Sequence, residues 1–165
     1  MKELICKCFE EYLKWYFYLF NEQPTYWNSE MIIVPQIDRG GHWKPESPNY
    51  DEVVSNVDNI SIHHDLYELY KGVRYLPITI KRKNYLITLE PLVDKEVLKG
   101  KRNCDFFFSL KENGEIYFVL GKAEAEYHDY AVVFKNDDGS ILLLDEDQLY
   151  PFYRNLSLFL GNEND

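Results

Sequence analysis

Six short runs of β-forming residues fill most of the chain after residue 75, and they limit the folds that it can adopt. Asn113-Gly114 separates the third run from the fourth, and NDDG at 136–139 joins the last two, as expected of hairpin turns. Several runs are apolar almost throughout, which indicates that helices cover part of the sheet. We predict an antiparallel meander of about five or six strands. The runs are LPITIK (76–81), NYLITLE (84–90), DFFFSL (105–110), EIYFVL (115–120), DYAVVFK (129–135) and GSILLLD (139–145).

Helical spacing of apolar residues flanks this region. In residues 8–20 an apolar stripe of the kind that usually faces a core is formed by Phe9, Tyr12, Leu13, Tyr16, Phe17 and Phe20. Asn49 and Glu52 fit a capping box that would start a short helix through Val57. Residues 147–160 predict a closing helix with Pro151 in its first turn. The order of helices, meander and helix predicts one α+β domain over residues 1–165.

Charge and composition restrict the partners of the chain. It has 18 Lys plus Arg against 28 Asp plus Glu, a formal net charge of −10, which disfavours nucleic acid and favours basic surfaces. Its 14 tyrosines could fill the core or serve an interface. Glu3, Glu10 and Glu11 interrupt any apolar region of a secretion signal. We expect a cytoplasmic protein with free thiols at Cys6, Cys8 and Cys104.

The adjacent residues His63, His64 and Asp65 pose the question of catalysis. They could belong to a metal-dependent hydrolase, but only His42 and His128 remain as further histidines. No zinc-protease, phosphate-loop or nucleophile-elbow motif is present. The alternative is a helix start, because Asp65 would lie in the first turn of a helix over 65–70, where negative charge is favourable. We expect this alternative, no metal, no cofactor and no enzymatic activity.

Several short motifs, in their order and spacing, resemble the Syd-like branch of the SUKH superfamily. Trp43-Lys44-Pro45 is similar to the W-x-P motif, and IHHDLYELY (62–70) to L-H-P-D-I-x-x-Y-Y, with His64 in place of the proline. FFFSL (106–110) is similar to the T-L-F-I strand, VFKNDDGSI (133–141) to the V-x-N-x-S-G-E-V hairpin, and LSLFL (156–160) to the closing L-x-x-F-L helix. The segment between residues 90 and 106 is shorter than in Syd and has no clear counterpart for its aromatic and acidic stretch.

The resemblance implies a curved sheet with packed helices and a role in binding protein. Most SUKH proteins look like immunity proteins, each of which neutralises one bacterial toxin, often a nuclease or deaminase. Syd instead engages basic cytosolic loops of the SecY translocon through an acidic concave face, which would bring this chain to a membrane only peripherally. The departure in the middle segment favours immunity. The expected partner-binding residues, around the sheet's concave face, are Trp43, Tyr50, Asp51, Glu52, Asp65 and Glu68, although Trp43 could instead be a core residue.

Overall fold

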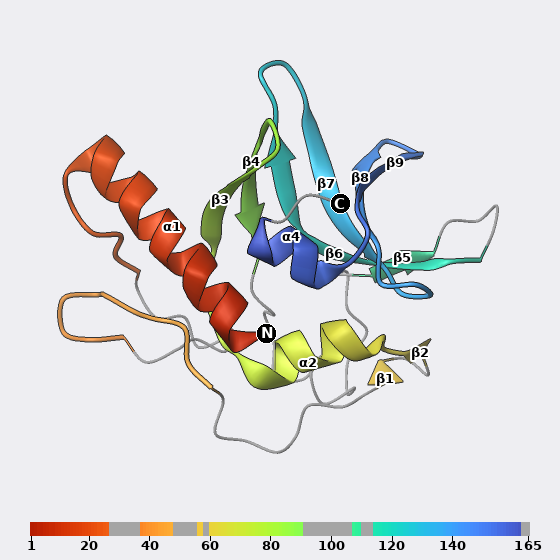
Figure 1. Ribbon diagram of the computed structural model, residues 1–165, viewed down its shortest axis with the longest axis horizontal. Coiled ribbons are helices and arrows are strands. Elements are labelled where there is room, and N and C mark those ends of the chain that lie inside the picture. The colour runs from red at the N-terminus through yellow and green to blue at the C-terminus, as the bar shows by residue number, and fades with distance from the viewer. Residues whose placement is uncertain (27–36, 48–55, 58–59, 91–106, 110–113, 163–165) are drawn as a thin grey trace.

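The strand-rich half of the chain folds into one antiparallel sheet, with helices packed against it (Figure 1). The computed structural model describes residues 1–26, 37–47, 56–57, 60–90, 107–109 and 114–162. The architecture is α+β, as predicted. Among the described residues, no helix has the length and apolar character that a membrane crossing requires.

Six strands form the continuous path of the sheet, and neighbours in the path are antiparallel. Their order is β3 (Ile78–Arg82), β4 (Tyr85–Leu89), β6 (Ile116–Glu124), β7 (Asp129–Lys135), β8 (Ile141–Asp145) and β9 (Gln148–Tyr153). A further strand, β5 (Phe107–Ser109), pairs with β6. All six predicted runs therefore contain a strand. The strands of both predicted hairpins pair: Ser109 with Ile116, and Phe134 with Ile141. Residues 110–113, with Asn113 of the first predicted turn, lie outside the described part of the chain.

A β-bulge between Val119 and Gly121 shifts the pairing of β6 with β7 by one residue. At this point β6 also approaches β4 closely. A Cβ atom on Gly121 would lie 2.0 Å from the carbonyl oxygen of Thr88, so the position accepts only glycine without a backbone shift. The bulge lets the distal part of the β6–β7 hairpin extend beyond the rest of the sheet (Figure 1).

Three helices bury apolar residues against the sheet and against one another. α1 (Lys2–Phe20) contacts β3 and the closing helix α4 (Leu156–Gly161), and its buried residues lie in its N-terminal half. α4 lies against the sheet in Figure 1. α2 (His64–Gly72) packs below it and buries Leu66, Leu69 and Tyr70. The short strands β1 (Asn56–Val57) and β2 (Ile60–Ser61) pair just before α2.

Arg82, at the end of β3, joins the sheet to both α1 and α4 and is fully buried. Its guanidinium group donates hydrogen bonds to the carbonyl oxygens of Phe159 and Leu160, the latter at 2.7 Å. It also donates to the Glu11 carboxylate of α1 at 2.9 Å. The last carbonyls of a helix have no partner within the helix. Arg82 therefore supplies donors that the end of α4 lacks.

The predicted closing helix is wrong over its first half. Residues 148–153 form strand β9, and α4 begins only at Leu156. The Asn155 side chain caps this helix by accepting a hydrogen bond from the Leu158 amide at 2.9 Å. β9 lies at the end of the strand path, where Pro151 is tolerated because an edge strand can lack one donor.

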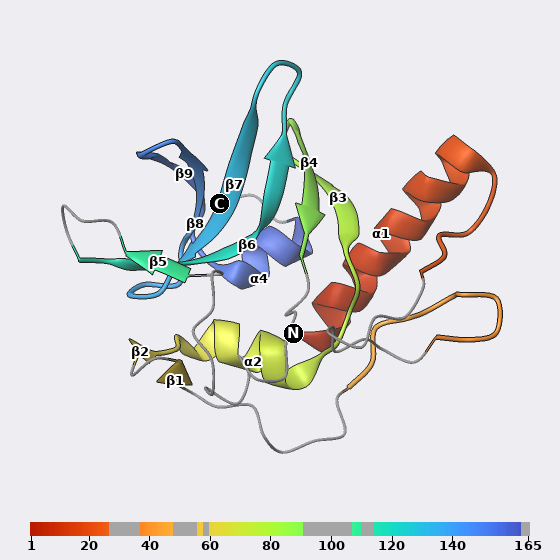
Figure 2. The ribbon, with the colours of Figure 1, turned by 180° about the vertical axis from the view of Figure 1, so that it is seen from behind.

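Two further expectations need correction. The helix predicted from Asn49 does not continue to Val57, because Asn56–Val57 is strand β1. Residues 49–55 lie outside the described part of the chain. The apolar stripe of α1 is core only at its start: Phe9 is buried, whereas Phe17 and Phe20 are each 54% exposed. Figures 1 and 2 show the second half of the helix leading away from β3, the edge strand of the sheet.

Candidate partner-binding surface

His63 contacts both α2 and the β7–β8 hairpin and so connects them. Its ring Nδ1 accepts a hydrogen bond from the Asp65 amide at 3.2 Å, which caps the start of α2. Its own main-chain N–H donates to the side-chain oxygen of Asn136 at 2.8 Å. The ring packs edge-on against Phe134 at 5.3 Å, and a Cβ atom on Gly139 would lie 2.8 Å from it. The contacts of His63 are thus those of a helix cap, as the helix-start interpretation predicts.

The other three histidines do not share the contacts of His63. His42 lies 3.3 Å from the Asp38 carboxylate in the loop after residue 36, and His128 lies 2.8 Å from Asp145. His64 is exposed at the first position of α2. Within the described ranges, no three His, Cys, Asp or Glu side chains gather in a group that could hold a metal ion.

The partner-binding residues expected from sequence are distributed over separate parts of the fold. Trp43 is only 8% exposed, and its ring lies 4.5 Å from that of Phe9, so it packs in the core beneath α1. Asp65 and Glu68 lie half-exposed on α2. Tyr50, Asp51 and Glu52 lie outside the described residues. Of the two interpretations of Trp43, its burial favours the core.

Three tyrosines from three strands converge where one face of the sheet extends past α4. Tyr85 begins β4, Tyr130 is the second residue of β7, and Tyr150 lies in β9. The ring centroids of Tyr85 and Tyr130 are 5.7 Å apart, and those of Tyr130 and Tyr150 are 6.4 Å apart, both edge to face. The ring of His128 lies 4.7 Å from that of Tyr130. We call these four residues, together with Asp145, the tyrosine cluster.

The tyrosine cluster continues the core outward on the side of α4. Val132, two positions after Tyr130 and therefore on the same face of β7, is fully buried in the core. Tyr85 contacts the ring of Phe152 at 5.5 Å, and Phe152 lies 6.1 Å from Phe159 of α4. A series of contacting aromatic rings therefore extends from the core to the exposed ring of Tyr150.

The outer part of the tyrosine cluster is accessible and carries a carboxylate. Tyr150 is 42% exposed, and the side chains of His128 and Asp145 are 50% and 31% exposed. Partial burial, together with the negative charge that Tyr85, Asp145 and Tyr150 can carry, raises the pKa of Tyr130 above its ordinary value. Tyr130 is therefore a neutral phenol at physiological pH.

This arrangement suits a cationic side chain from a partner. Aromatic faces attract ammonium and guanidinium groups. Asp145, which pairs with His128 through one oxygen and is 31% exposed, adds a carboxylate that a partner's cation could share. Tyrosine also gives a large contact area at low entropic cost, which is why it is common at binding hot spots. The sequence offered one signal of this surface, the surplus of tyrosine. Its position depends on the register of strands that lie far apart in the chain.

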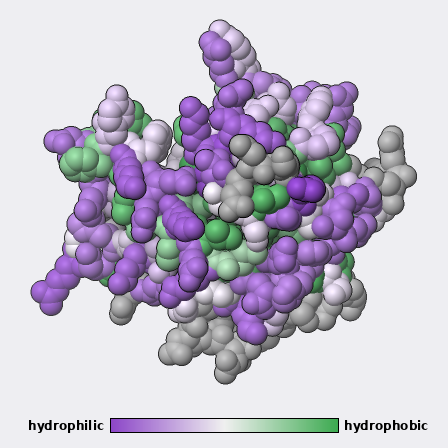
Figure 3. All heavy atoms as spheres, in the orientation of Figure 1, coloured by the Kyte–Doolittle hydropathy of each residue, from purple (hydrophilic) through white to green (hydrophobic). Residues whose placement is uncertain are grey.

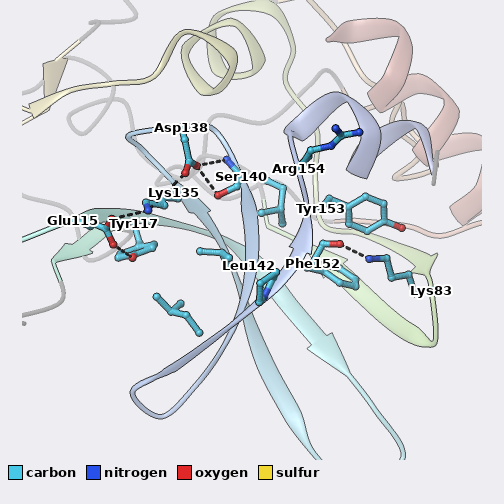
Figure 4. A pocket seen from close by; sticks show the side chains of 13 residues that line it. Lys83, Glu115, Tyr117, Lys135, Asp138, Ser140, Leu142, Phe152, Tyr153 and Arg154 are labelled. Atoms are coloured by element: carbon cyan, nitrogen blue, oxygen red, sulfur yellow. Dashed lines mark hydrogen bonds and ion pairs between the residues drawn. The ribbon is translucent and has the colours of Figure 1, made fainter. Parts of the chain in front are cut away.

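A hollow of about 610 Å³ beside β9 is a second candidate, and Figure 4 shows its lining. One wall carries Lys135, which lies 2.6 Å from the Glu115 carboxylate, and Tyr117, which donates to Glu115 at 2.6 Å. These hydrogen bonds lower the pKa of Glu115. On the other wall Lys83 donates to the carbonyl oxygen of Phe152. These charged groups are already engaged with protein atoms, so we assign the hollow no ligand.

Comparisons with known proteins leave the family open. No protein-family model matches the chain, and no curated protein matches it either. The resemblance to the SUKH superfamily therefore stays a prediction from short motifs.

Proposed function

We propose that this protein is a non-catalytic binding module that acts as an immunity protein, neutralising a cognate bacterial toxin of the nuclease or deaminase type. The tyrosine cluster carries this proposal, because it is an open aromatic surface with a carboxylate on a chain of net charge −10. The resemblance to the SUKH superfamily supplies the class of partner.

The physical basis is complementarity of charge and shape. A toxin that acts on nucleic acid presents a positive surface, because it must bind phosphates. The negative field of this chain speeds encounter with such a surface. The rings of the tyrosine cluster then provide buried contact area, and this area governs dissociation. Occupying the positive surface would deny it to nucleic acid.

The test is co-expression with the C-terminal toxin module of a large secreted protein encoded next to this gene. We expect the wild-type chain to restore growth and to form a complex whose rates can be measured by surface plasmon resonance. Tyr150→Ala should speed dissociation about 30-fold if this ring is a hot spot. Asp145→Lys should slow association and flatten its dependence on salt. Tyr18→Ala is the matched control, because Tyr18 is an exposed ring on α1, away from both candidate surfaces, and it should leave both rates unchanged.

The same binding assay tests whether the carboxylates of α2 contact the partner. Asp65 and Glu68 remain expected contacts, and Glu68→Lys should slow association if α2 faces the partner. An effect of Glu68→Lys without any effect of Tyr150→Ala would move the binding surface from the tyrosine cluster to α2.

Other outcomes would refute the proposed function itself. Binding to peptides from cytosolic SecY loops, in the absence of any toxin gene nearby, would favour the translocon-linked role. Zinc or manganese retained at stoichiometric level through purification, and lost in His63→Ala, would refute the non-catalytic assignment.

A further inference from the structure

The last turn of α1 exposes apolar side chains around its whole circumference. Phe17 and Phe20 are each 54% exposed, Leu19 is 50% exposed and Tyr18 is 85% exposed. Consecutive residues of an α-helix are about 100° apart around its axis, so these four side chains point in all directions. A helix that is apolar all round is normally buried.

This end of α1 projects from the body of the molecule. The buried residues of the helix are Ile5, Cys8 and Phe9, all in its first half. Figures 1 and 2 show the second half leading away from β3 and β4. Green and pale side chains gather there in the upper left of Figure 3.

The projecting end is nevertheless a well-formed helix. Asn21 adopts the left-handed conformation (φ 54°), and its N–H donates to the carbonyl oxygen of Phe17 at 2.8 Å, which closes the last turn. The rings of Tyr16 and Phe20, one turn apart on the helix, contact each other at a tilt of 45°, with centroids 4.5 Å apart. The apolar surface is therefore presented on a fixed scaffold.

The charges around this surface indicate what covers it. Residues 12–20 contain Lys14 as their one charged residue, in a chain with 28 acidic residues. The flanking carboxylates are Glu11, which pairs with Arg82, and the exposed Glu22 beyond the last turn. The basic partner proposed for the tyrosine cluster would find one countercharge, Glu22, at the edge of this surface and would meet Lys14 within it. A second copy of this chain would fit better, since two molecules of charge −10 repel one another least where carboxylates are fewest. The same apolar surface on both copies is also self-complementary, as a twofold interface requires.

We propose that the C-terminal half of α1 is the contact between two copies of this chain in a symmetric dimer. The dimer is independent of the toxin-binding role, because it uses a surface on a different element from the tyrosine cluster. Association through apolar surface between like-charged molecules has a characteristic dependence on salt. Added salt screens the repulsion, so it should tighten this dimer.

Sedimentation equilibrium of the full-length chain, over a range of protein and salt concentrations, tests the proposal. We expect a monomer–dimer equilibrium that shifts toward dimer as salt rises. Tyr18→Glu should raise the dimer dissociation constant about 30-fold or more, because it places a charge in the contact. Tyr127→Glu is a matched control: Tyr127 is 90% exposed, lies beyond β6 and undergoes the same chemical change. It should leave the dissociation constant nearly unchanged, and circular dichroism should show both variants folded.

Three results would overturn the dimer. The first is a chain that stays monomeric at its highest soluble concentration. The second is an equal effect of Tyr18→Glu and Tyr127→Glu on association. The third is a monomer that co-sediments with phosphatidylcholine vesicles and loses this binding in Tyr18→Glu, which would assign the apolar end of α1 to a lipid surface.

Discussion

Replacing Arg82 by alanine should be among the most destabilising single changes in this fold. The guanidinium group is fully buried and holds three elements together, through the carbonyl oxygens of Phe159 and Leu160 on α4 and the carboxylate of Glu11 on α1. In Arg82→Ala each carbonyl loses its charged donor and keeps a longer contact, from Asn162 N–H to Phe159 at 3.4 Å and from the Cys8 thiol to Leu160 at 3.3 Å. The carbonyl oxygens therefore keep only a weaker donor each.

The magnitude follows from the hydrogen bonds that are lost. Hydrogen bonds that involve a charged group contribute about 1.5–3 kcal/mol each, so losing the two from Arg82 costs roughly 3–6 kcal/mol. The lost Glu11 contact adds little, because that side chain is 44% exposed and its charge is screened by water. We expect Arg82→Ala to lower the free energy of unfolding by about 4 kcal/mol, a large part of the roughly 5–15 kcal/mol typical of a domain.

Urea denaturation monitored by circular dichroism measures this loss. Glu11→Ala is the matched control, because it removes the exposed half of the ion pair and keeps the bonds to α4. It should cost about 1 kcal/mol or less. Arg82→Lys should be intermediate, since an ammonium group lacks the planar fork that reaches two carbonyls at once. The reasoning fails if Glu11→Ala costs as much as Arg82→Ala, or if Arg82→Ala costs less than about 1 kcal/mol.

Three further predictions concern buried side chains. Trp43→Ala should cost about 3–5 kcal/mol in a urea titration, because the Trp43 ring packs on Phe9 in the core; a small loss would restore its interface role. His63→Ala should cost about 1 kcal/mol through the lost cap of α2, without any change in bound metal by mass spectrometry. Burial raises the pKa of the Cys8 thiol from 9.0 to about 12, although the Arg82 charge opposes this. Iodoacetamide at pH 8 should therefore modify Cys8 only after unfolding, because the thiolate is the reactive form. The stability that the neutral Cys8 thiol contributes should be lost as the pH rises from about 9 toward 12.

Sequence was sufficient for the six strands from β3 to β8 because their signals are local. Hairpin turns and short apolar runs identified all six predicted strands, and Asp65 identified the start of α2. Sequence misassigned residues 148–153 because Leu149, Phe152 and Tyr153 recur at helical spacing. The pairing of β9 with β8 decides the outcome, with five residue pairs from Ile141↔Tyr153 to Asp145↔Gln148. Tertiary pairing overrides local periodicity when the partner strand offers a complete hydrogen-bonding edge.

The binding surface was harder to predict, because it depends on where strands end relative to one another. Tyr85, Tyr130 and Tyr150 are separated by 20 or more positions in the chain, and nothing in their neighbours sets them apart from core tyrosines. Trp43 was chosen for its loop position, yet the bridge between Glu46 and Arg74 holds this loop against the body, and Trp43 is buried. A conspicuous aromatic in a loop is thus not itself a sign of an interface.

In both α1 and β9, some aromatic residues lie in the core and others are exposed. Which of the two applies depends on how far the packed helix or sheet extends over them. Along α1 the stripe is core at Phe9, where the helix meets the sheet and α4, and becomes surface at Phe17, where that contact has ended. In β9, Phe152 is buried in the core beside α4, whereas Tyr150, two positions earlier, lies beyond α4 and is exposed. Neither change alters the periodicity of the sequence, because spacing specifies which residues share a face and leaves open whether that face is covered. The exposed ends of both aromatic series are rigid continuations of packed cores, so a partner that binds them need not order flexible groups first.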